Sequence, residues 1–328
     1  MAGALCGAIL FFCAIAGWSG MPRAESPILV PPESVVAIAP SALRISPVPL
    51  NLENRDLRFG GLSSLLISED GNQLLAVSDR GYWVGASLDY RDGQLAGAHN
   101  LLISPLLDLD GRNLLDNRTL GADAEAVTEI PGSGLVVAFE GNHRLWHYGA
   151  GFSDFMMQKT AHPLPLPVVT ADAIAALPGN GGIEAMTTLP NGSLVAIAEE
   201  NTARADRLQG WIIGEPSIAR FTYLASDNFR PTDLTALPNG DLLVLERRLT
   251  LMQGLAARVR HILAADLKAP GPVKARNIAT LSYPYNIDNM EGIATRQGPG
   301  GETYVYLLSD DNYLSLQRTL LMMFRLEL

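Results

Sequence analysis

Residues 182–201 read Gly-Ile-Glu-Ala-Met-Thr-Thr-Leu-Pro-Asn-Gly-Ser-Leu-Val-Ala-Ile-Ala-Glu-Glu-Asn. Apolar residues alternate on either side of Pro190-Asn191-Gly192, and an Asn-Gly pair tolerates the positive φ of a tight turn. The segment therefore predicts a β-hairpin. Glu184 begins its first strand and Glu199 ends its second, and in an antiparallel pair these two points lie side by side.

The same hairpin recurs four times along the chain. One copy, from Asp233 to Glu246, has the same Pro-Asn-Gly turn, and the others begin at residues 63, 125 and 291. The starts at 63, 125, 184, 233 and 291 are separated by 62, 59, 49 and 58 residues, a period typical of propeller blades or solenoid arrays. Further β-type runs, such as Trp211–Gly214 and Ala219–Leu224, bring each unit to about four strands, as in a propeller blade.

The predicted fold is all-β, a single β-propeller with four-stranded blades. Five blades are favoured, because residues 41–328 number 288 and five units at the mean spacing of 57 would use 285. Six blades stay open as an alternative, since the longer spacings could hide strands that lack the marker hairpin. We expect the run around Val48–Leu52 to close the ring by pairing with Met322–Leu328, which removes exposed sheet edges. Helical periodicity is nearly absent, and one short helix is predicted at Ala171–Leu177.

The N-terminal region carries none of these repeats. Ala2–Trp18 is apolar and uncharged, so residues 1–25 are predicted to be an export signal, with an uncleaved membrane anchor as the alternative. Six prolines between Ser26 and Pro49 predict an extended lead-in over residues 26–44, which leaves 45–328 for the propeller domain. Both cysteines lie in the signal, so no disulfide is expected after its removal. The expected location is periplasmic or secreted.

The charge of the chain limits the classes of molecule that it is expected to bind. Net charge is −10, and the composition disfavours nucleic acid as a partner because no basic patch is present. Membrane contact is expected only through the N-terminal segment, if that segment is not cleaved. Three lysines accompany 21 arginines, and arginine suits bidentate recognition of carboxylate or phosphate. A small anionic or ester substrate is the expected ligand.

The repeats place acidic residues at one end of the propeller. Each first strand starts, and each second strand ends, on the same rim, so a ring of carboxylates is expected at the channel mouth. The predicted ring contains Glu125, Glu184, Asp233 and Glu291, flanked by Asp79, Glu140, Glu199, Glu246 and Asp310. Gathered carboxylates repel one another unless they are protonated, paired with arginine or neutralised by a cation. An all-oxygen set suits Ca²⁺, while purely structural bonding between blades is the alternative role.

These repeats resemble the phytase-like family, described as "esterase-like activity of phytase". The resemblance is carried by Glu125-Ala-Val-Thr with Phe139-Glu-Gly, by Gly182-Ile-Glu-Ala-Met, by Asn289-Met-Glu-Gly-Ile-Ala and by Ser309-Asp-Asp-Asn, and it extends over about residues 45–328. It implies a β-propeller fold, bacterial export and hydrolysis of esters or phosphoesters. The chain departs from the acidic pattern at Ser63, which leaves one blade without a carboxylate at the marker position.

The hydrolase hypothesis assigns a role to each class of side chain. Predicted ligands of a Ca²⁺ ion are Glu125, Glu184, Asp233, Glu291, Asp310 and Asp311. Predicted catalytic carboxylates are Glu184, Asp233, Glu199 and Glu246, and predicted substrate-binding cations are Arg80, Arg118 and Arg247. A serine-hydrolase triad is disfavoured, because the chain has no Gly-x-Ser-x-Gly sequence. The competing hypothesis is a non-catalytic periplasmic propeller that serves as a binding or scaffolding module.

Overall fold

The computed structural model describes residues 43–45, 49–116, 120–157, 160–201, 204–214 and 218–328. All of them belong to one compact unit. The predicted export signal, nearly all of the predicted lead-in and Arg118 lie outside the described residues. Among the described residues, no helix is long and apolar enough to span a membrane.

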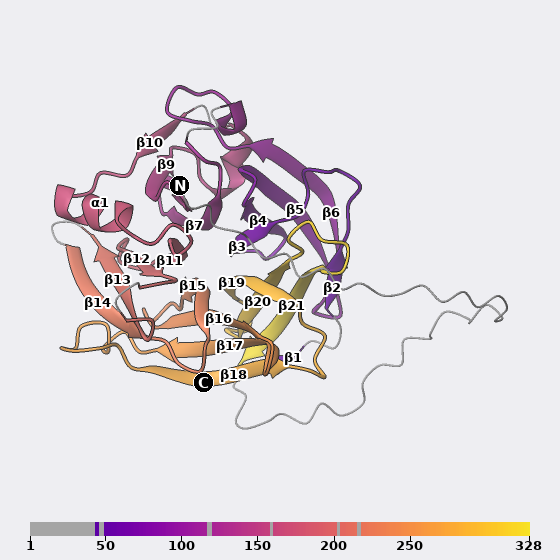
Figure 1. The fold of residues 1–328 in the computed structure, drawn as a ribbon. Helices are drawn as coiled ribbons and strands as arrows, with labels where there is room; N and C mark the ends of the chain where they lie inside the picture. Colours follow the sequence, from indigo (N-terminus) through magenta and orange to yellow (C-terminus); the bar gives the residue numbers. More distant parts are fainter. Residues whose placement is uncertain (1–42, 46–48, 117–119, 158–159, 202–203, 215–217) are drawn as a thin grey trace, which may run out of the picture. The chain divides into compact units, whose positions relative to one another are not determined.

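The described chain forms the five four-stranded antiparallel blades of a β-propeller (Figure 1). Blades 1 to 4 each contain four consecutive strands, each paired with the next. Blade 1 contains β3 (Leu62–Ile67), β4 (Gln73–Ser78), β5 (Tyr82–Arg91) and β6 (Gln94–Pro105). Blade 2 contains β7 (Ala124–Ile130), β8 (Gly134–Phe139), β9 (Arg144–Tyr148) and β10 (Ala161–Pro163).

Blades 3 and 4 include the two hairpins with the Pro-Asn-Gly turn. Blade 3 contains β11 (Ile183–Thr188), β12 (Leu194–Ala198), β13 (Arg207–Ile213) and β14 (Ile218–Leu224). Blade 4 contains β15 (Arg230–Ala236), β16 (Leu242–Thr250), β17 (Gly254–Ile262) and β18 (Ala275–Ser282). The predicted hairpin at residues 182–201 is therefore confirmed as β11 and β12, and the five-blade prediction is confirmed as well.

Blade 5 joins the two ends of the described chain. It contains β19 (Asn289–Gln297), β20 (Thr303–Asp310) and β21 (Thr319–Leu326), and β1 (Leu43–Ile45) is its outer strand. Closure by an N-terminal strand is confirmed, but the register differs from the prediction. β2 (Leu50–Leu52) pairs with Thr319–Leu321, and within the predicted partner Met322–Leu328 the residues Phe324–Leu326 pair with β1 instead.

The hydrophobic core is divided among the blade interfaces. The first strands β3, β7, β11, β15 and β19 pack against one another around the axis, and an apolar cluster fills the space between each pair of neighbouring blades. Between blades 1 and 2, for example, Trp83 meets Tyr148 edge to face at 5.3 Å between ring centroids. Each sheet thus buries both faces, which fixes the inner strands that carry the predicted ring.

Helical structure is confined to the connections. The short helix is α1 (Val168–Ala175), which begins after Pro167 and lies between β10 and β11. It starts three residues earlier than predicted and follows Pro167, which is its N-cap residue. Two 3₁₀ turns, η1 (Leu114–Asp116) and η2 (Phe152–Met157), complete the described secondary structure.

Candidate functional site at the mouth of the propeller channel

The first strand of every blade is interrupted by a β-bulge or a register shift near its start. In blade 2 the extra residue is Glu125, between Ala124, which pairs with Phe139, and Ala126, which pairs with Ala138. Glu184 and Glu291 are the extra residues of blades 3 and 5. A bulge re-aims its side chain, so these glutamates leave the alternation of the strand. Their carboxyl groups are near enough to raise one another's pKa values, although burial is the larger cause.

Blade 4 has a different residue at the same position. Pro231 pairs with Glu246 and Asp233 pairs with Leu245, which leaves Thr232 as the extra residue. Thr232 and Arg247 therefore occupy the positions that Glu184 and Glu199 have in blade 3. The prediction that Asp233 is equivalent to Glu184 is therefore wrong by one residue.

Counting residues from the Pro-Asn-Gly turn gives the correct equivalence between the two blades. Glu184 stands six residues before Pro190, and six residues before the matching Pro238 stands Thr232. Counting nine residues forward from each proline gives Glu199 in blade 3 and Arg247 in blade 4. The count works because the same turn fixes the same hairpin register in both blades.

Asp233 lies inside the inner wall of the propeller, where it is 1% exposed. Its Oδ1 accepts hydrogen bonds from Ser64 Oγ at 3.2 Å and from the backbone N–H of Leu234 at 2.9 Å. Its Oδ2 accepts the backbone N–H groups of Leu65 at 3.2 Å and Ile293 at 2.8 Å. Burial raises the pKa of the Asp233 carboxyl, while the four donors favour its charged form. Asp233 therefore links blades 1, 4 and 5 next to the axis.

Glu246 is also enclosed, within blade 4. Its side chain is completely buried, Oε2 accepts a short hydrogen bond from Arg258, and Oε1 accepts one from the Tyr223 hydroxyl at 2.7 Å. Arg260 Nη1 lies 3.6 Å from Oε1. Two guanidinium groups thus neutralise this carboxylate away from the channel.

Arg247 neutralises one half of the ring. Its Nε lies 3.3 Å from Glu291 Oε1, its Nη2 lies 3.7 Å from Glu199 Oε1, and its Nη1 donates to Asn289 Oδ1 at 2.8 Å. Burial raises the pKa of Glu291 to about 8 and also raises that of Glu199, and in both cases Arg247 opposes the shift. Glu184 hydrogen-bonds to Glu199, so these two carboxyls are placed to share a proton. We call Glu184, Glu199, Glu291, Asn289 and Arg247 the arginine half.

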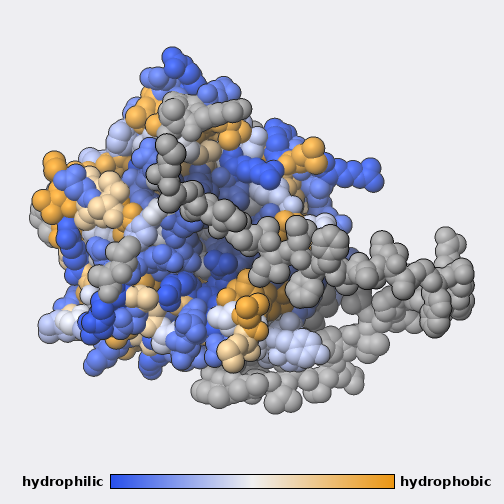
Figure 2. Space-filling model, in the orientation of Figure 1, coloured by the Kyte–Doolittle hydropathy of each residue, from blue (hydrophilic) through white to orange (hydrophobic). Residues whose placement is uncertain are grey.

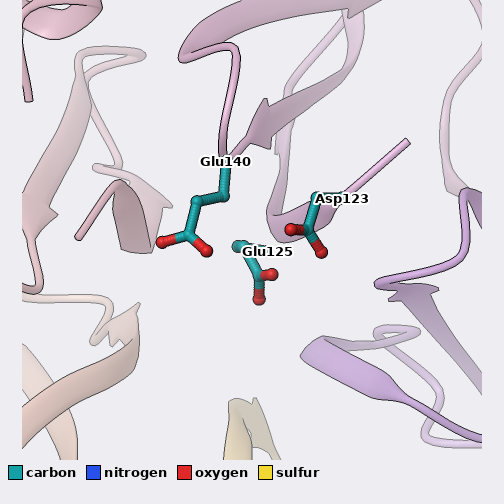
Figure 3. A group of neighbouring side chains, drawn as sticks. All are labelled: Asp123, Glu125 and Glu140. Atoms are coloured by element: carbon teal, nitrogen blue, oxygen red, sulfur yellow. The ribbon is translucent and has the colours of Figure 1, made fainter. Parts of the chain in front are cut away.

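The other half of the ring consists of carboxylates alone. Asp123, Glu125 and Glu140 each offer an oxygen, and these oxygens lie within 4.8 Å of one another (Figure 3). No arginine or lysine among the described residues forms an ion pair with any of the three. Burial raises the pKa of Glu125 well above its ordinary value and that of Glu140 to about 7, although the Gly182 N–H at 3.2 Å opposes the latter shift. We call these three residues the acidic half.

Blades 1 and 5 complete the rim. Burial raises the pKa of Asp79 to about 7 and that of Asp310 to about 6. Asp311 is engaged with the backbone, because its Oδ1 accepts the N–H groups of Gly61 at 3.1 Å and of Tyr313 at 3.0 Å. The exposed Arg80 stacks over the Tyr313 ring, with its guanidinium carbon 3.3 Å from the ring centroid.

The structure therefore brings together part of the predicted set. Six residues lie near enough to affect one another's pKa values, whereas Arg80 stacks on Tyr313, and Asp233 and Glu246 are enclosed. The six are Glu125, Glu184, Glu199, Glu291, Asp310 and Arg247. Sequence reasoning missed Asp123 and Asn289. Each stands two residues before a bulge glutamate, and this repeated polar position was the available signal. Hydrophilic residues gather around the middle of the face seen along the axis (Figure 2).

Comparison with known proteins places these features in a family. The sequence model described as "Phytase-like: Esterase-like activity of phytase" matches residues 57–313. No curated protein matches the chain. Among solved structures, a luciferin-regenerating enzyme is 10% identical with a TM-score of 0.42, over 84% of this chain and 95% of that one. A protein of unknown function from Bacteroides caccae is 8% identical with a TM-score of 0.32, over 75% and 68% of the two chains.

Proposed function

The chain belongs to the phytase-like family, and from this premise we propose that its channel mouth is the centre of a calcium-dependent hydrolase of phosphoric or carboxylic esters. The observation that carries the proposal is the acidic half, in which three carboxylates converge without a cationic partner among the described residues. The substrate is a small anionic or ester molecule. The following steps rest on the geometry of the two halves of the ring.

The donor set of the acidic half fits Ca²⁺. Asp123, Glu125 and Glu140 offer only carboxylate oxygens, which hard cations prefer. The raised pKa values of Glu125 and Glu140 are caused by burial first and by the neighbouring carboxylates second, so a bound cation would stabilise their charged forms. Ca²⁺ bound by these residues would supply Lewis-acid polarisation of a phosphoryl or acyl oxygen. Glu184, Glu291 and Asp310 stay proposed ligands from the facing blades, while the enclosed Asp233 and the backbone-bonded Asp311 have other partners.

The arginine half supplies the groups that handle substrate and protons. Arg247 stands at the centre of this half and would orient an anionic group, with Arg80 at the rim as a second cation. Glu199 accepts the proton of the attacking water, because a raised pKa makes its carboxylate a stronger base at neutral pH. Glu184 shares that proton through its hydrogen bond to Glu199.

Calcium binding and turnover test this proposal together. The protein is stripped with chelator, and its melting temperature and its turnover of p-nitrophenyl phosphate and p-nitrophenyl acetate are measured with and without Ca²⁺. We expect a calcium-dependent rise in melting temperature and calcium-dependent turnover. Glu125→Gln should lose both, whereas Glu199→Gln should keep the thermal shift and lose turnover by at least about a hundredfold, typical of a general base.

Matched controls separate a site effect from a surface effect. Glu69 is exposed, so Glu69→Gln should behave as the parent protein does. Full calcium-dependent turnover in Glu125→Gln would refute the proposed ion site. Equal turnover in Glu199→Gln would refute its role as the base.

A non-catalytic binding or scaffolding module is the second candidate. It is favoured by Arg247, whose three polar contacts already engage it with protein groups. This candidate predicts calcium-dependent melting with no turnover of either ester. We also propose export to the periplasm or outside the cell, because Ala2–Trp18 reads as an export signal, and cell fractionation tests this directly.

A further inference from the structure

A groove opens between blades 4 and 5. It is an open groove of about 580 Å³ between the tip of the β16–β17 hairpin and the loop that leads into β19. Its lining includes Leu255, Tyr283, Pro284, Tyr285, Ile287 and Arg318. The volume falls in the range typical of small-molecule sites.

Both walls of this groove continue strands that build the ring. Arg247 is the last residue of β16 that pairs with β15, where its partner is Arg230. Beyond it, β16 pairs only with β17, and the last pair of this hairpin is Thr250 with Gly254. The hairpin therefore projects beyond the level of the ring at the channel mouth. The second wall ends at Ile287, two residues before β19 begins. The groove therefore opens on the same rim as the arginine half and neighbours it through Asp288, which bonds the lining residue Arg318 and directly precedes Asn289.

The hairpin tip and the facing loop expose large apolar side chains. Leu251 is 99% exposed, Met252 97%, Tyr283 92% and Leu249 68%. The turn at the other end of blade 4 consists instead of Pro238-Asn239-Gly240. Figure 2 shows a hydrophobic patch beside the hydrophilic centre, where Figure 1 draws the β16–β17 hairpin. Soluble proteins seldom expose such groups together unless the surface binds something.

A single cation stands among the residues that line this groove. Arg318 is 43% exposed, its Nε lies 3.6 Å from Asp288 Oδ2, and its backbone N–H donates to the same oxygen at 3.2 Å. Asp288 is nearly buried, so it holds Arg318 in place while leaving part of the guanidinium accessible. The groove therefore combines mainly apolar side chains with one positive group that is held by Asp288, the residue before Asn289 of the arginine half. This pattern matches an amphiphilic anion whose charged end lies on the side of Asp288 and the channel mouth.

We propose that this groove binds the hydrocarbon chain of an amphiphilic ester or phosphoester whose polar group lies at the channel mouth. The inference rests on the proposed function, because it names the class of substrate for that site. Each methylene that enters the groove should tighten binding by about fourfold when it is fully buried. A chain of eight carbons should therefore bind at least about ten times more tightly than one of four.

Calorimetric titration tests the groove without requiring turnover. Monomeric n-octyl phosphate, n-butyl phosphate and inorganic phosphate are titrated into the full protein with Ca²⁺ present. We expect the octyl ester to bind at least tenfold more tightly than the butyl ester. The double variant Tyr283→Ser with Leu255→Ser changes two residues that line the groove and should bring this ratio close to one, while circular dichroism checks that the fold is retained.

A matched control lies at the opposite end of blade 4. Leu263 directly follows β17 and is 38% exposed, so Leu263→Ser should leave the octyl-to-butyl ratio unchanged. Equal affinities for the two esters in the parent protein, or an unchanged ratio in the double variant, would refute the proposal that the groove binds the hydrocarbon chain. If affinity depends on chain length but no p-nitrophenyl ester is turned over, the groove proposal stands and the hydrolase proposal is refuted. If turnover depends on calcium but the two affinities are equal, the hydrolase proposal stands and the groove proposal is refuted.

Discussion

Blades 2 and 4 are copies of the same hairpin, yet they use their acidic residues in opposite ways. In blade 2, Glu125 and Glu140 lie at the channel mouth beside Asp123. In blade 4, Glu246 is bonded to Arg258 inside the sheet, and Asp233 is enclosed by backbone donors. The difference arises from one residue of register at a bulged strand, because a shift of one residue exchanges the two faces of a strand.

The comparison separates two energetic roles of carboxylates. Enclosed acids with complete sets of donors or guanidinium partners contribute to the fold, and removing one leaves its partners unpaired. Acids gathered without a cation oppose the fold at neutral pH, and we propose that their role is to bind a ligand. Three predictions test this separation, beginning with the largest effect.

Removing the enclosed acid of blade 4 should be strongly destabilising. In Glu246→Ala, Arg258 and the Tyr223 hydroxyl lose their buried acceptor. Loss of one partner of a buried ion pair costs about 3–5 kcal/mol, so the free energy of unfolding in urea should fall by this amount. Glu69→Ala at the surface is the control, with an expected change of less than about 0.5 kcal/mol. A similarly small change in Glu246→Ala would remove the contrast between the blades.

The acidic half of blade 2 should destabilise the calcium-free protein as pH rises. The folded pKa of Glu140 is about 7 and its ordinary value is 4.5, so the folded state binds more protons than the unfolded state between these limits. The contribution of Glu140 to the free energy of unfolding is therefore fully present below pH 4.5, and it is lost as pH rises to about 7. After allowance for solvent screening, the loss from this group should be about 2 kcal/mol.

Urea unfolding at pH 5, 6, 7 and 8 in chelator measures this loss. Glu140→Gln should flatten the profile because its amide cannot ionise, and Ca²⁺ should restore stability to the parent protein near neutral pH. A parent profile that is flat from pH 5 to 8, or one that Glu140→Gln leaves unchanged, would contradict the proposed strain among these carboxylates.

The smallest expected effect concerns the blade 4 residue that replaces the bulge glutamate. Thr232 is 2% exposed, and its Oγ1 donates to the backbone oxygen of Met290 at 2.9 Å. Thr232→Val should lower the free energy of unfolding by about 1 kcal/mol, the usual contribution of one such hydrogen bond. Its calcium-dependent thermal shift should equal that of the parent protein. Loss of that shift would show that blade 4 takes part in ion binding.

The repeat was visible in the sequence because alternation and turn chemistry act locally. Asn191-Gly192 and the alternating strands beside it identified the hairpin, and its period identified the blades. The roles of Asp233 and Glu246 were not visible in the same way. Their surroundings depend on a bulge and on Arg258, which stands twelve residues after Glu246 and reaches it only through the pairing of β16 with β17.

Blade 5 imposes an order of events on the growing polypeptide. Its outer strand β1 comes from the beginning of the described chain, and its other strands come from the end. The first of the described strands therefore has no partner until β21 has been synthesised, and blade 5 is completed after the other four blades. A chain stalled before Thr319 has no partner strand for Leu43–Ile45 and leaves β20 without the neighbour that covers its outer edge.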